Sequence, residues 1–314
     1  MFYGPVLSRR FGYSLGVDLI PLKVCVYDCV YCQLGKTTNK TIERKKYVDI
    51  DYSEFRNELK KRIKSYPYID YITFSGSGEP TLNSDIGKLI EMAKENSSIP
   101  VVVLTSGGTL SIDGVIDDIK GADLIKVSLD ASDDRLLKKI NRPPKEINFN
   151  MNMYGLQKLM GRFSGDIWLE IMVLGDINDG ADDVYKFKSI IEQLGDGIKK
   201  IHLNTPVRSL GENKGRHPVK IPSLKKLEKI RDILGDKAII IGDVSRRKYS
   251  SNMVEIEKEI IELLKRRPVR IKEIAFSLGL NINEVIKFIN KLLNSGEVER
   301  VIRNSKEYYF KPGG

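Results

Sequence analysis

The sequence predicts an α/β fold made of parallel β/α units, followed by a second, smaller module. Up to about residue 245, short runs rich in β-branched residues alternate with amphipathic helical stretches, which is typical of parallel strands joined by helices. Residues 246–252 are polar and interrupt this alternation, and residues 253–314 show three helical patterns and two short strand patterns. We therefore expect a large domain over 1–245, a linker over 246–252 and a small domain over 253–314.

The expected elements of the large domain alternate along the chain. Its strands are expected at Gly16–Pro21, Ile69–Ser75, Pro100–Thr105, Leu124–Asp130, Ile167–Leu174, Lys200–Asn204 and Ala238–Ile241. Helical periodicity lies between them at Glu54–Ser65, Ile86–Glu95, Asp182–Leu194 and Leu224–Leu234. Ser53 is placed to cap the first helix, and Gly195 follows the third helix, where a left-handed residue is favoured. The pattern is compatible with either an open sheet or a barrel.

The small domain has the element order of a winged helix, a variant of the helix-turn-helix. Its helices are expected at Val254–Lys265, Lys272–Leu278 and Glu284–Leu293, with a short apolar run at Val269–Ile271 between the first two. Glu297–Ile302 and Glu307–Phe310 are suited to pair as a hairpin. Because these helices have apolar faces of their own, we expect this domain to fold apart from the large one.

The composition favours a globular protein with polyanionic partners. The 314 residues include 52 Lys and Arg against 42 Asp and Glu, a net charge of +10, and the pI is about 9.2. No stretch approaches the roughly 18–20 apolar residues of a membrane span, and the first ten residues lack the apolar run of a secretory signal. We therefore expect a cytoplasmic, soluble protein that makes no membrane contact.

Three cysteines lie close together in the chain, at Cys25, Cys29 and Cys32. They follow the first expected strand, so they share a loop on which their thiolates can converge. Three cysteines at these spacings suit three irons of a 4Fe–4S cluster and leave the fourth iron without a protein ligand. The alternatives are a zinc site completed by His202 or His217, and a chance group of buried cysteines. Zinc motifs usually contain a second pair of ligands, which is missing here.

At these residues the sequence resembles the radical S-adenosylmethionine (SAM) superfamily. The signature of that superfamily has this spacing, with an aromatic residue before the last cysteine, here Tyr31. The segments Gly4–Arg10, Ser14–Gly16 and Cys29–Gly35 look like one prokaryotic branch that is grouped with wyosine-tRNA synthase relatives. The resemblance covers roughly residues 1–245, and it implies a partial (β/α)6-type radical SAM barrel.

The resemblance also implies a cofactor and a reaction. The open iron would be chelated by the amino and carboxylate groups of SAM. An electron from the reduced cluster would then break the C5′–S bond, and the 5′-deoxyadenosyl radical would take a hydrogen atom from the substrate. Such an enzyme would need an electron donor such as ferredoxin or flavodoxin.

Further site residues follow from the same resemblance. Gly78 and Glu79 lie in Ser75–Pro80, which resembles a Gly-Gly-Glu-Pro segment that contacts the ammonium of SAM; an ordinary Gly/Pro turn is the alternative. Family positions for the rest of the cofactor are matched by Thr105, Ser128, Asp130 and Asn178. For Asp130 the alternative is a cap of the next helix. Nearly all these residues lie at or just beyond the carboxyl end of an expected strand, where β/α barrels have their active sites.

The sequence predicts the substrate less specifically than it predicts the cofactor. Arg208 is suited to bind a substrate phosphate, and Arg300, Arg303 and Lys306 lie beside the expected wing, where nucleic-acid phosphates would be contacted. We therefore expect RNA or DNA as a partner and modification of a nucleotide, such as one in tRNA, as the reaction. The alternatives are an activase or modifier of a protein or small metabolite, and an iron–sulfur DNA-binding regulator.

Overall fold

The computed structural model describes residues 1–206, 219–241, 253–266, 268–278, 280, 282–303 and 306–312. Arg208, His217 and the expected linker at 246–252 lie outside the described residues, as do the side chains of Arg303 and Lys306. Within the described part of the chain, no helix has the length and hydropathy needed to cross a membrane.

An eight-stranded sheet forms the centre of the large domain, in the order β1-β2-β5-β6-β7-β8-β9-β10. Its strands are β1 (Phe2–Ser8), β2 (Gly12–Val17), β5 (Tyr71–Phe74), β6 (Val101–Thr105), β7 (Leu124–Ser128), β8 (Asp166–Met172), β9 (Ile198–Asn204) and β10 (Ala238–Ile240). β1 and β2 are antiparallel, and every later pairing is parallel. The mostly parallel α/β fold predicted from the alternating pattern is therefore confirmed.

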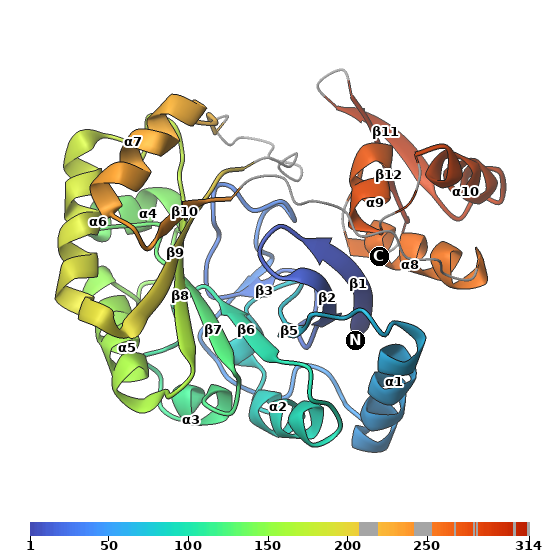
Figure 1. Ribbon diagram of the computed structural model, residues 1–314, viewed down its shortest axis with the longest axis horizontal. Helices are drawn as coiled ribbons and strands as arrows, with labels where there is room; N and C mark the ends of the chain where they lie inside the picture. Colours follow the sequence, from blue (N-terminus) through green and yellow to red (C-terminus); the bar gives the residue numbers. More distant parts are fainter. Residues whose placement is uncertain are drawn as a thin grey trace.

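Helices cover the outer face of this curved sheet (Figure 1). They are α1 (Tyr52–Ser65), α2 (Ile86–Glu95), α3 (Val115–Ile119), α4 (Asp134–Ile140), α5 (Phe149–Arg162), α6 (Ala181–Leu194) and α7 (Leu224–Leu234), with short 3-10 turns η1 (Pro80–Leu82) and η2 (Gly195–Gly197). The side chains between helices and sheet form the main apolar core, which includes Phe55, Ile72, Leu89 and Phe187.

The caps of these helices test two expectations. The side chain of Asp51, and not that of Ser53, caps α1, because Asp51 accepts hydrogen bonds from the backbone N–H groups of Ser53 and Glu54. The prediction of Ser53 as the cap is therefore wrong by two residues. Gly195 follows α6 with a positive φ of +67°, as expected for glycine at a helix end, but its ψ of −148° differs from that of a left-handed helical residue.

The first strand of the sheet differs from the prediction. The strand expected at Gly16–Pro21 is β2 at Gly12–Val17, and the chain before it forms the unforeseen edge strand β1. Glycine and proline are uncommon inside strands, but β1 accommodates Gly4 and Pro5 at an irregular step between Tyr3 and Val6. An edge strand tolerates proline because one side of its backbone has no strand to pair with.

The small domain contains α8 (Met253–Arg266), α9 (Ile271–Ser277), α10 (Ile282–Asn294) and the hairpin of β11 (Glu299–Arg303) and β12 (Lys306–Phe310). Val269 and Tyr309 exchange backbone hydrogen bonds and so add a third short segment to the hairpin. The domain has an apolar core of its own around Ile260, Val285 and Ile289. The expected order of elements is therefore present.

The small domain nevertheless packs on the large one along β1 (Figure 1). Glu259 of α8 is buried at this contact, and it accepts hydrogen bonds from Arg62 at 2.8 Å and Tyr66 at 3.2 Å, both in or next to α1. Burial at this contact raises the pKa of the Glu259 carboxyl group to about 7. The small domain thus contacts the large one, and the independent folding of the two domains stays a prediction.

Candidate functional site

The three cysteines lie in the loop that follows β2. Cys25 ends the short strand β3 (Val24–Cys25), which pairs with β4 (Asn39–Lys40). The backbone N–H of Cys32 donates to the carbonyl of Cys29, so a tight turn holds these two residues. All three thiols are free, and each side chain is partly exposed. The structure therefore brings together the cysteines that the sequence pattern grouped.

Neighbouring side chains contact the cysteine sulfurs. Lys23 Nζ donates to Cys32 Sγ at 3.1 Å, and Asn141 Nδ2 lies 3.5 Å from Cys29 Sγ. Lys23 is buried and has a left-handed backbone, with a φ of +63°. Donors of this kind stabilise the negative charge of a metal-bound thiolate.

Two observations concern the cysteines as possible metal ligands. Burial and the Glu79 carboxylate raise the pKa of Cys25 to about 12, and burial also raises the pKa of Cys29. Among the described residues, no three His, Cys, Asp or Glu side chains lie close enough to hold one metal ion. His202 therefore does not join the cysteines in such a group, and the zinc site expected as an alternative with His202 is not formed.

The segment around Gly78 is bonded directly to the cysteine loop. The N–H of Lys23 donates to the carbonyl of Ser77 at 2.8 Å, and the N–H of Glu79 donates to the carbonyl of Val24 at 3.2 Å. At Gly78 a Cβ atom would collide with the Val24 carbonyl, so this close approach requires glycine. The segment that resembles the ammonium-binding loop therefore lies beside the ligand loop.

Glu79 braces two loops with one buried carboxylate. It accepts hydrogen bonds from the hydroxyls of Thr81, Thr105 and Ser106 at 2.5–2.8 Å, and from the backbone N–H groups of Thr81 and Ser106. These donors come from η1, from the last residue of β6 and from the turn that follows β6. Thr105 and Ser106 thus fix the position of the Glu79 segment, a structural role that the sequence alone did not indicate for Ser106.

Asp130 joins the cysteine loop to the barrel. Its carboxylate accepts hydrogen bonds from the hydroxyl of Tyr31, from Asn141 Nδ2 at 3.0 Å and from the N–H of Met172 at 2.9 Å. Burial raises the pKa of this carboxyl group. The cap of α4 is Asp133, so the alternative that Asp130 caps the next helix is wrong.

Ser128 and Asn178 lie near the same end of the sheet. Ser128 is the last residue of β7. The Asn178 amide is buried and bonds only backbone groups: it donates to the carbonyls of Asp130 and Met172 and accepts from Leu174 N–H. These bonds show that Asn178 holds the loop after β8, and a contact with the cofactor remains a prediction for both residues.

The interior of the barrel has an apolar floor. Phe11, from the turn between β1 and β2, stacks on Trp168 with the ring centroids 5.6 Å apart and also contacts Tyr71. His202 packs edge-on against the same Trp168 ring. The turn of the N-terminal hairpin β1–β2 therefore packs against the inner face of the curved sheet, at the end of the interior that contains Tyr71 and Trp168.

A charged layer lies on this floor. Glu170 of β8 contacts Arg10 and pairs with Lys126 of β7 at 2.9 Å. Burial alone would raise the pKa of Glu170, but these two cations lower it to about 2. Burial, together with the nearby cations, lowers the pKa of His202 to about 4, so its imidazole is neutral at pH 7.

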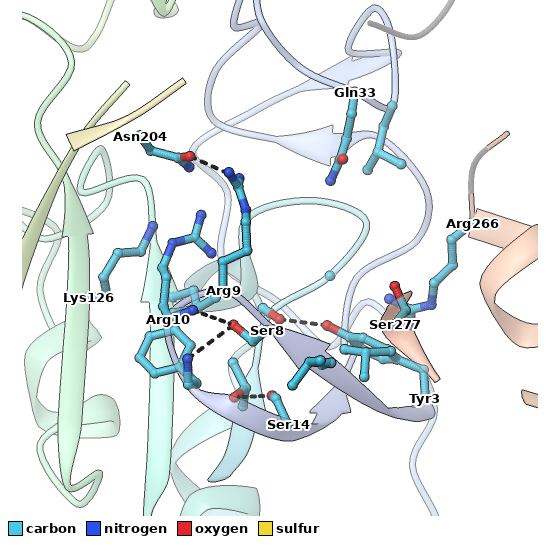
Figure 2. A pocket seen from close by; sticks show the side chains of 18 of the residues that line it. Tyr3, Ser8, Arg9, Arg10, Ser14, Gln33, Lys126, Asn204, Arg266 and Ser277 are labelled. Carbon is cyan, nitrogen blue, oxygen red and sulfur yellow. Dashed lines mark hydrogen bonds between the residues drawn. The ribbon is translucent and has the colours of Figure 1, made fainter. Parts of the chain in front are cut away.

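Above this layer a cavity of about 410 Å³ opens beside Cys32. Figure 2 shows Arg9, Arg10 and Lys126 on one side and Arg266 and Ser277 on the other, with Gln33 above them. A volume of this size lies in the range of small-molecule sites. The cavity lies between the cysteine loop, the Ser75–Ser77 segment and the small domain, so a molecule in it would lie next to the cysteines.

A family model described as the radical SAM superfamily matches residues 19–212, more than half of the chain. The chain belongs to the radical SAM superfamily. Members of this superfamily are enzymes that typically use a 4Fe–4S cluster and SAM. The superfamily predicted from the cysteine spacing is therefore confirmed. The matched residues include the cysteine loop, the Glu79 brace and Asp130.

Two curated relatives match most of this radical SAM chain. The UPF0026 protein MJ1312 of Methanocaldococcus jannaschii is 32% identical over 315 residues, which cover 98% of this chain and 95% of that protein. A protein named GTPase Obg from Brachyspira hyodysenteriae is 35% identical over 302 residues, or 96% of this chain; the match spans 44% of that longer protein. The small domain is therefore part of the shared sequence.

A solved structure supports the radical SAM fold. A radical SAM methyltransferase from Sphaerobacter thermophilus superposes with a TM-score of 0.52 at 17% identity, covering 72% of this chain and 65% of that chain. At this identity the likeness concerns the fold alone.

Sequence reasoning missed the basic side chains of the cavity. Arg9 and Arg10 lie in the segment Gly4–Arg10, which resembles the family but received no predicted role. Arg266, at the end of α8, and Lys23, beside the cysteines, also received no predicted role. An isolated basic residue carries little signal, and only the path of the N-terminal hairpin places Arg9 and Arg10 inside the barrel.

Proposed function

We propose that this protein reductively cleaves SAM at a 4Fe–4S cluster held by Cys25, Cys29 and Cys32, and uses the resulting radical on a substrate bound in the adjoining cavity. The observation that carries the proposal is the pair of backbone hydrogen bonds between Lys23–Val24 and Ser77–Glu79. They place the glycine-rich segment against the ligand loop, where one molecule can touch both.

The cluster, when bound, would supply the electron that breaks the C5′–S bond of SAM and yields a 5′-deoxyadenosyl radical. The protein supports this chemistry by position. Lys23 and Asn141 donate to the sulfurs of the ligand loop, and the bond between Tyr31 and Asp130 fixes that loop to the sheet. The apolar floor bounds one end of the cavity, and Leu263, Arg266 and Ser277 of the small domain line another side of it.

The test is anaerobic reconstitution with iron and sulfide. The wild-type protein should bind about four irons per chain, and each of the variants Cys25→Ala, Cys29→Ala and Cys32→Ala should lose the cluster absorbance. With a strong reductant and SAM, the wild type should form 5′-deoxyadenosine and the variants should not. Stoichiometric zinc, without iron-dependent absorbance, would contradict the proposal.

The finer proposal is a nucleotide substrate, such as one in tRNA, with the small domain acting as a winged helix that binds the nucleic acid. The exposed Arg300 of β11 supports it, although Glu307 lies 3.3 Å away and offsets part of its charge. Binding to RNA or DNA should weaken steeply with salt, and replacing Arg300, Arg303 and Lys306 together should flatten that dependence. Ferredoxin or flavodoxin is proposed as the electron donor.

A further inference from the structure

Two exposed lysines lie next to the cysteines on a surface outside the cavity. Lys40 is the partner of Cys25 in the parallel pair of β3 and β4. Lys36 follows Gly35, whose backbone N–H donates to the carbonyl of Cys32. Among the described residues that line the cavity, neither lysine is present. Each lysine is therefore close to a ligand cysteine without facing the substrate site.

A third cation reaches the same loop from the end of α4. Arg142 follows Asn141, whose Nδ2 lies 3.5 Å from Cys29 Sγ. The backbone N–H of Asp28 also donates to the carbonyl of Asn141 at 2.9 Å, so this segment is bonded to the cysteine loop. Each of the three cysteines thus has a cation within one or two residues of a group that contacts it.

These three cations lie on one surface. Lys40 Nζ donates to the carbonyl of Arg142 at 3.2 Å. The Asp28 carboxylate lies 3.8 Å from Arg142 and accepts from the N–H of Thr37 at 2.7 Å, and Thr37 follows Lys36. We call residues 36–40 and 138–145 together the basic patch.

Positive charge predominates in the basic patch after the neighbouring carboxylates are counted. The carboxylates that contact the patch or adjoin it in the chain are Asp28, Asp134 and Glu146, and two more, Glu43 and Asp133, pair with lysines outside it. The patch itself contains no Asp or Glu, and its six cations are Lys36, Lys40, Lys138, Lys139, Arg142 and Lys145.

The cysteines do not reverse this sign. Thiolates that hold an iron–sulfur cluster are offset by the positive charge of the iron ions they bind. Lys23 Nζ also donates to Cys32 Sγ at 3.1 Å. Lys36 and Lys40 are exposed, whereas the cysteine side chains are only partly so. A protein that approaches this surface therefore meets the lysines before the cluster.

Resting on the proposed function, we propose that the basic patch docks an acidic one-electron carrier protein that reduces the cluster. One electron leaves the reduced carrier and enters the cluster, and no covalent bond forms or breaks. Redox encounters use small interfaces, often below about 1,200 Å², and opposite charges speed their formation. Because the described lining of the cavity includes no residue of the patch, the carrier and the substrate can bind at the same time.

The first test is direct binding, with oxidised flavodoxin, a small acidic flavoprotein, as the probe. Surface plasmon resonance measures its Kd for the cluster-containing protein. The Kd should rise with salt, and Lys36→Glu/Lys145→Glu should raise it at least about tenfold. Lys225→Glu/Lys229→Glu, at exposed positions on α7, makes the same change of net charge and is the matched control, with a Kd within about twofold of the wild type.

The second test is the rate of electron transfer. Stopped-flow absorbance follows the cluster after mixing with flavodoxin hydroquinone or, separately, with dithionite. Dithionite is a small anion that needs no protein docking surface. The ratio of the flavodoxin rate to the dithionite rate should therefore fall at least about tenfold in Lys36→Glu/Lys145→Glu and stay near the wild-type ratio in the control.

An unchanged Kd for flavodoxin in a folded Lys36→Glu/Lys145→Glu protein overturns the proposal, as does flavodoxin binding that is insensitive to salt. A short single-stranded RNA is titrated as a second polyanion. If the double variant weakens the binding of the RNA and leaves that of flavodoxin unchanged, the patch serves a nucleic acid and the proposal fails.

The proposed function is measured separately, as 5′-deoxyadenosine formed by the wild type with dithionite and SAM. If no 5′-deoxyadenosine forms while flavodoxin binding depends on the patch, the proposed function fails and the docking surface stands. If 5′-deoxyadenosine forms and flavodoxin binding does not depend on the patch, only the docking surface fails.

Discussion

Lys23 shows how one side chain can influence the chemistry at the cysteines. Its ammonium group is buried and donates to Cys32 Sγ at 3.1 Å. Reduction adds negative charge to an iron–sulfur cluster, and a nearby positive donor stabilises that charge. The side chain is therefore placed to set how readily the cluster accepts an electron.

Replacing Lys23 with Met should make the reduction potential of the reconstituted cluster more negative, because a hydrogen bond and a positive charge next to a ligand sulfur are lost. A redox titration followed by electron paramagnetic resonance measures the shift. Lys36→Met, at an exposed position in the same loop, is the control and should leave the potential nearly unchanged. Equal shifts in the two variants would show that Lys23 acts only through the net charge of the loop.

Glu79 offers a second test at the scale of single residues, in this case of stability. Glu79→Gln replaces a buried carboxylate by an amide whose NH₂ group would face a hydroxyl or N–H donor. We expect the free energy of unfolding to fall by about 2–3 kcal/mol, the range for hydrogen bonds to a buried charge. Denaturant unfolding measures it, with the exposed Glu91→Gln as control. A loss no larger than that of the control would mean that the brace contributes nothing to stability.

The residues that could be predicted from the sequence are those with a strict spacing. Cys25, Cys29 and Cys32 share one loop, so local spacing suffices to group them. Lys23 and Arg9 have no such spacing, because each reaches its place through contacts with distant segments. Glu79 was predicted by resemblance, but its bonds to Thr105 and Ser106 depend on two loops meeting after the sheet has formed.

At the scale of elements, the end of α8 holds the segment that follows β5. Arg266 lies over the Tyr3 ring, 3.4 Å from its centroid, and pairs with Asp18. Asp18 in turn accepts hydrogen bonds from the N–H and hydroxyl of Ser77, and the Tyr3 hydroxyl bonds Ser75 at 2.7 Å. The small domain is thus connected through two side chains to the proposed SAM loop.

Arg266→Gln should weaken SAM binding several-fold, because Asp18 and Tyr3 lose the cation that orders them and the Ser75–Ser77 segment becomes less fixed. Calorimetric titration of SAM into the cluster-containing protein measures the dissociation constant. The neighbouring exposed Lys265→Gln is the matched control. An unchanged dissociation constant in a folded Arg266→Gln protein would show that the contact serves packing alone.

The elements themselves were largely predictable, and each exception has a local cause. α1, α2, α6 and α7 match their expected ranges within a few residues because their apolar faces repeat with helical periodicity. β1 was missed because Gly4 and Pro5 interrupt its pattern, and the antiparallel partner that stabilises it lies only a turn away. α3, α4 and α5 were not assigned, since α3 and α4 are short and α5 contains two glycines, Gly155 and Gly161, which disfavour a helix interior.

At the scale of the whole molecule, the barrel interior links pH to stability. Lys126, Glu170 and His202 come from three neighbouring strands, Arg10 comes from the N-terminal hairpin, and Lys200 lies on the strand of His202. The fold keeps His202 neutral, with a pKa of about 4 against about 6.5 in an unfolded chain. Because the unfolded chain takes up the proton first, stability contributed by neutral His202 is lost as the pH falls from 6.5 to 4.

Compared with His202→Gln, the wild type should lose melting temperature as the pH falls from 6.5 to 4, because glutamine does not titrate. Glu259, whose pKa burial raises to about 7, stabilises both proteins as the pH falls, so the difference between the two curves is the quantity to compare. Below pH 4.5 both proteins should lose further stability as Glu170, with a pKa lowered to about 2, begins to take up protons in the unfolded state. His217→Gln, which changes the only other histidine of the chain, is the control. Parallel pH curves for the wild type and His202→Gln would show that another group is responsible.

The wall of the cavity is assembled from segments that lie far apart in the chain, which affects how the protein is made. A ribosome releases Ser8–Phe11 well before Arg266 and Ser277, which lie about 250 residues further along the chain. Domains that fold during translation form in this order, from the N-terminus onward. The loop with Cys25, Cys29 and Cys32 can therefore be reached from this side, and iron and sulfur delivered to it, before the last helices arrive to cover the opening.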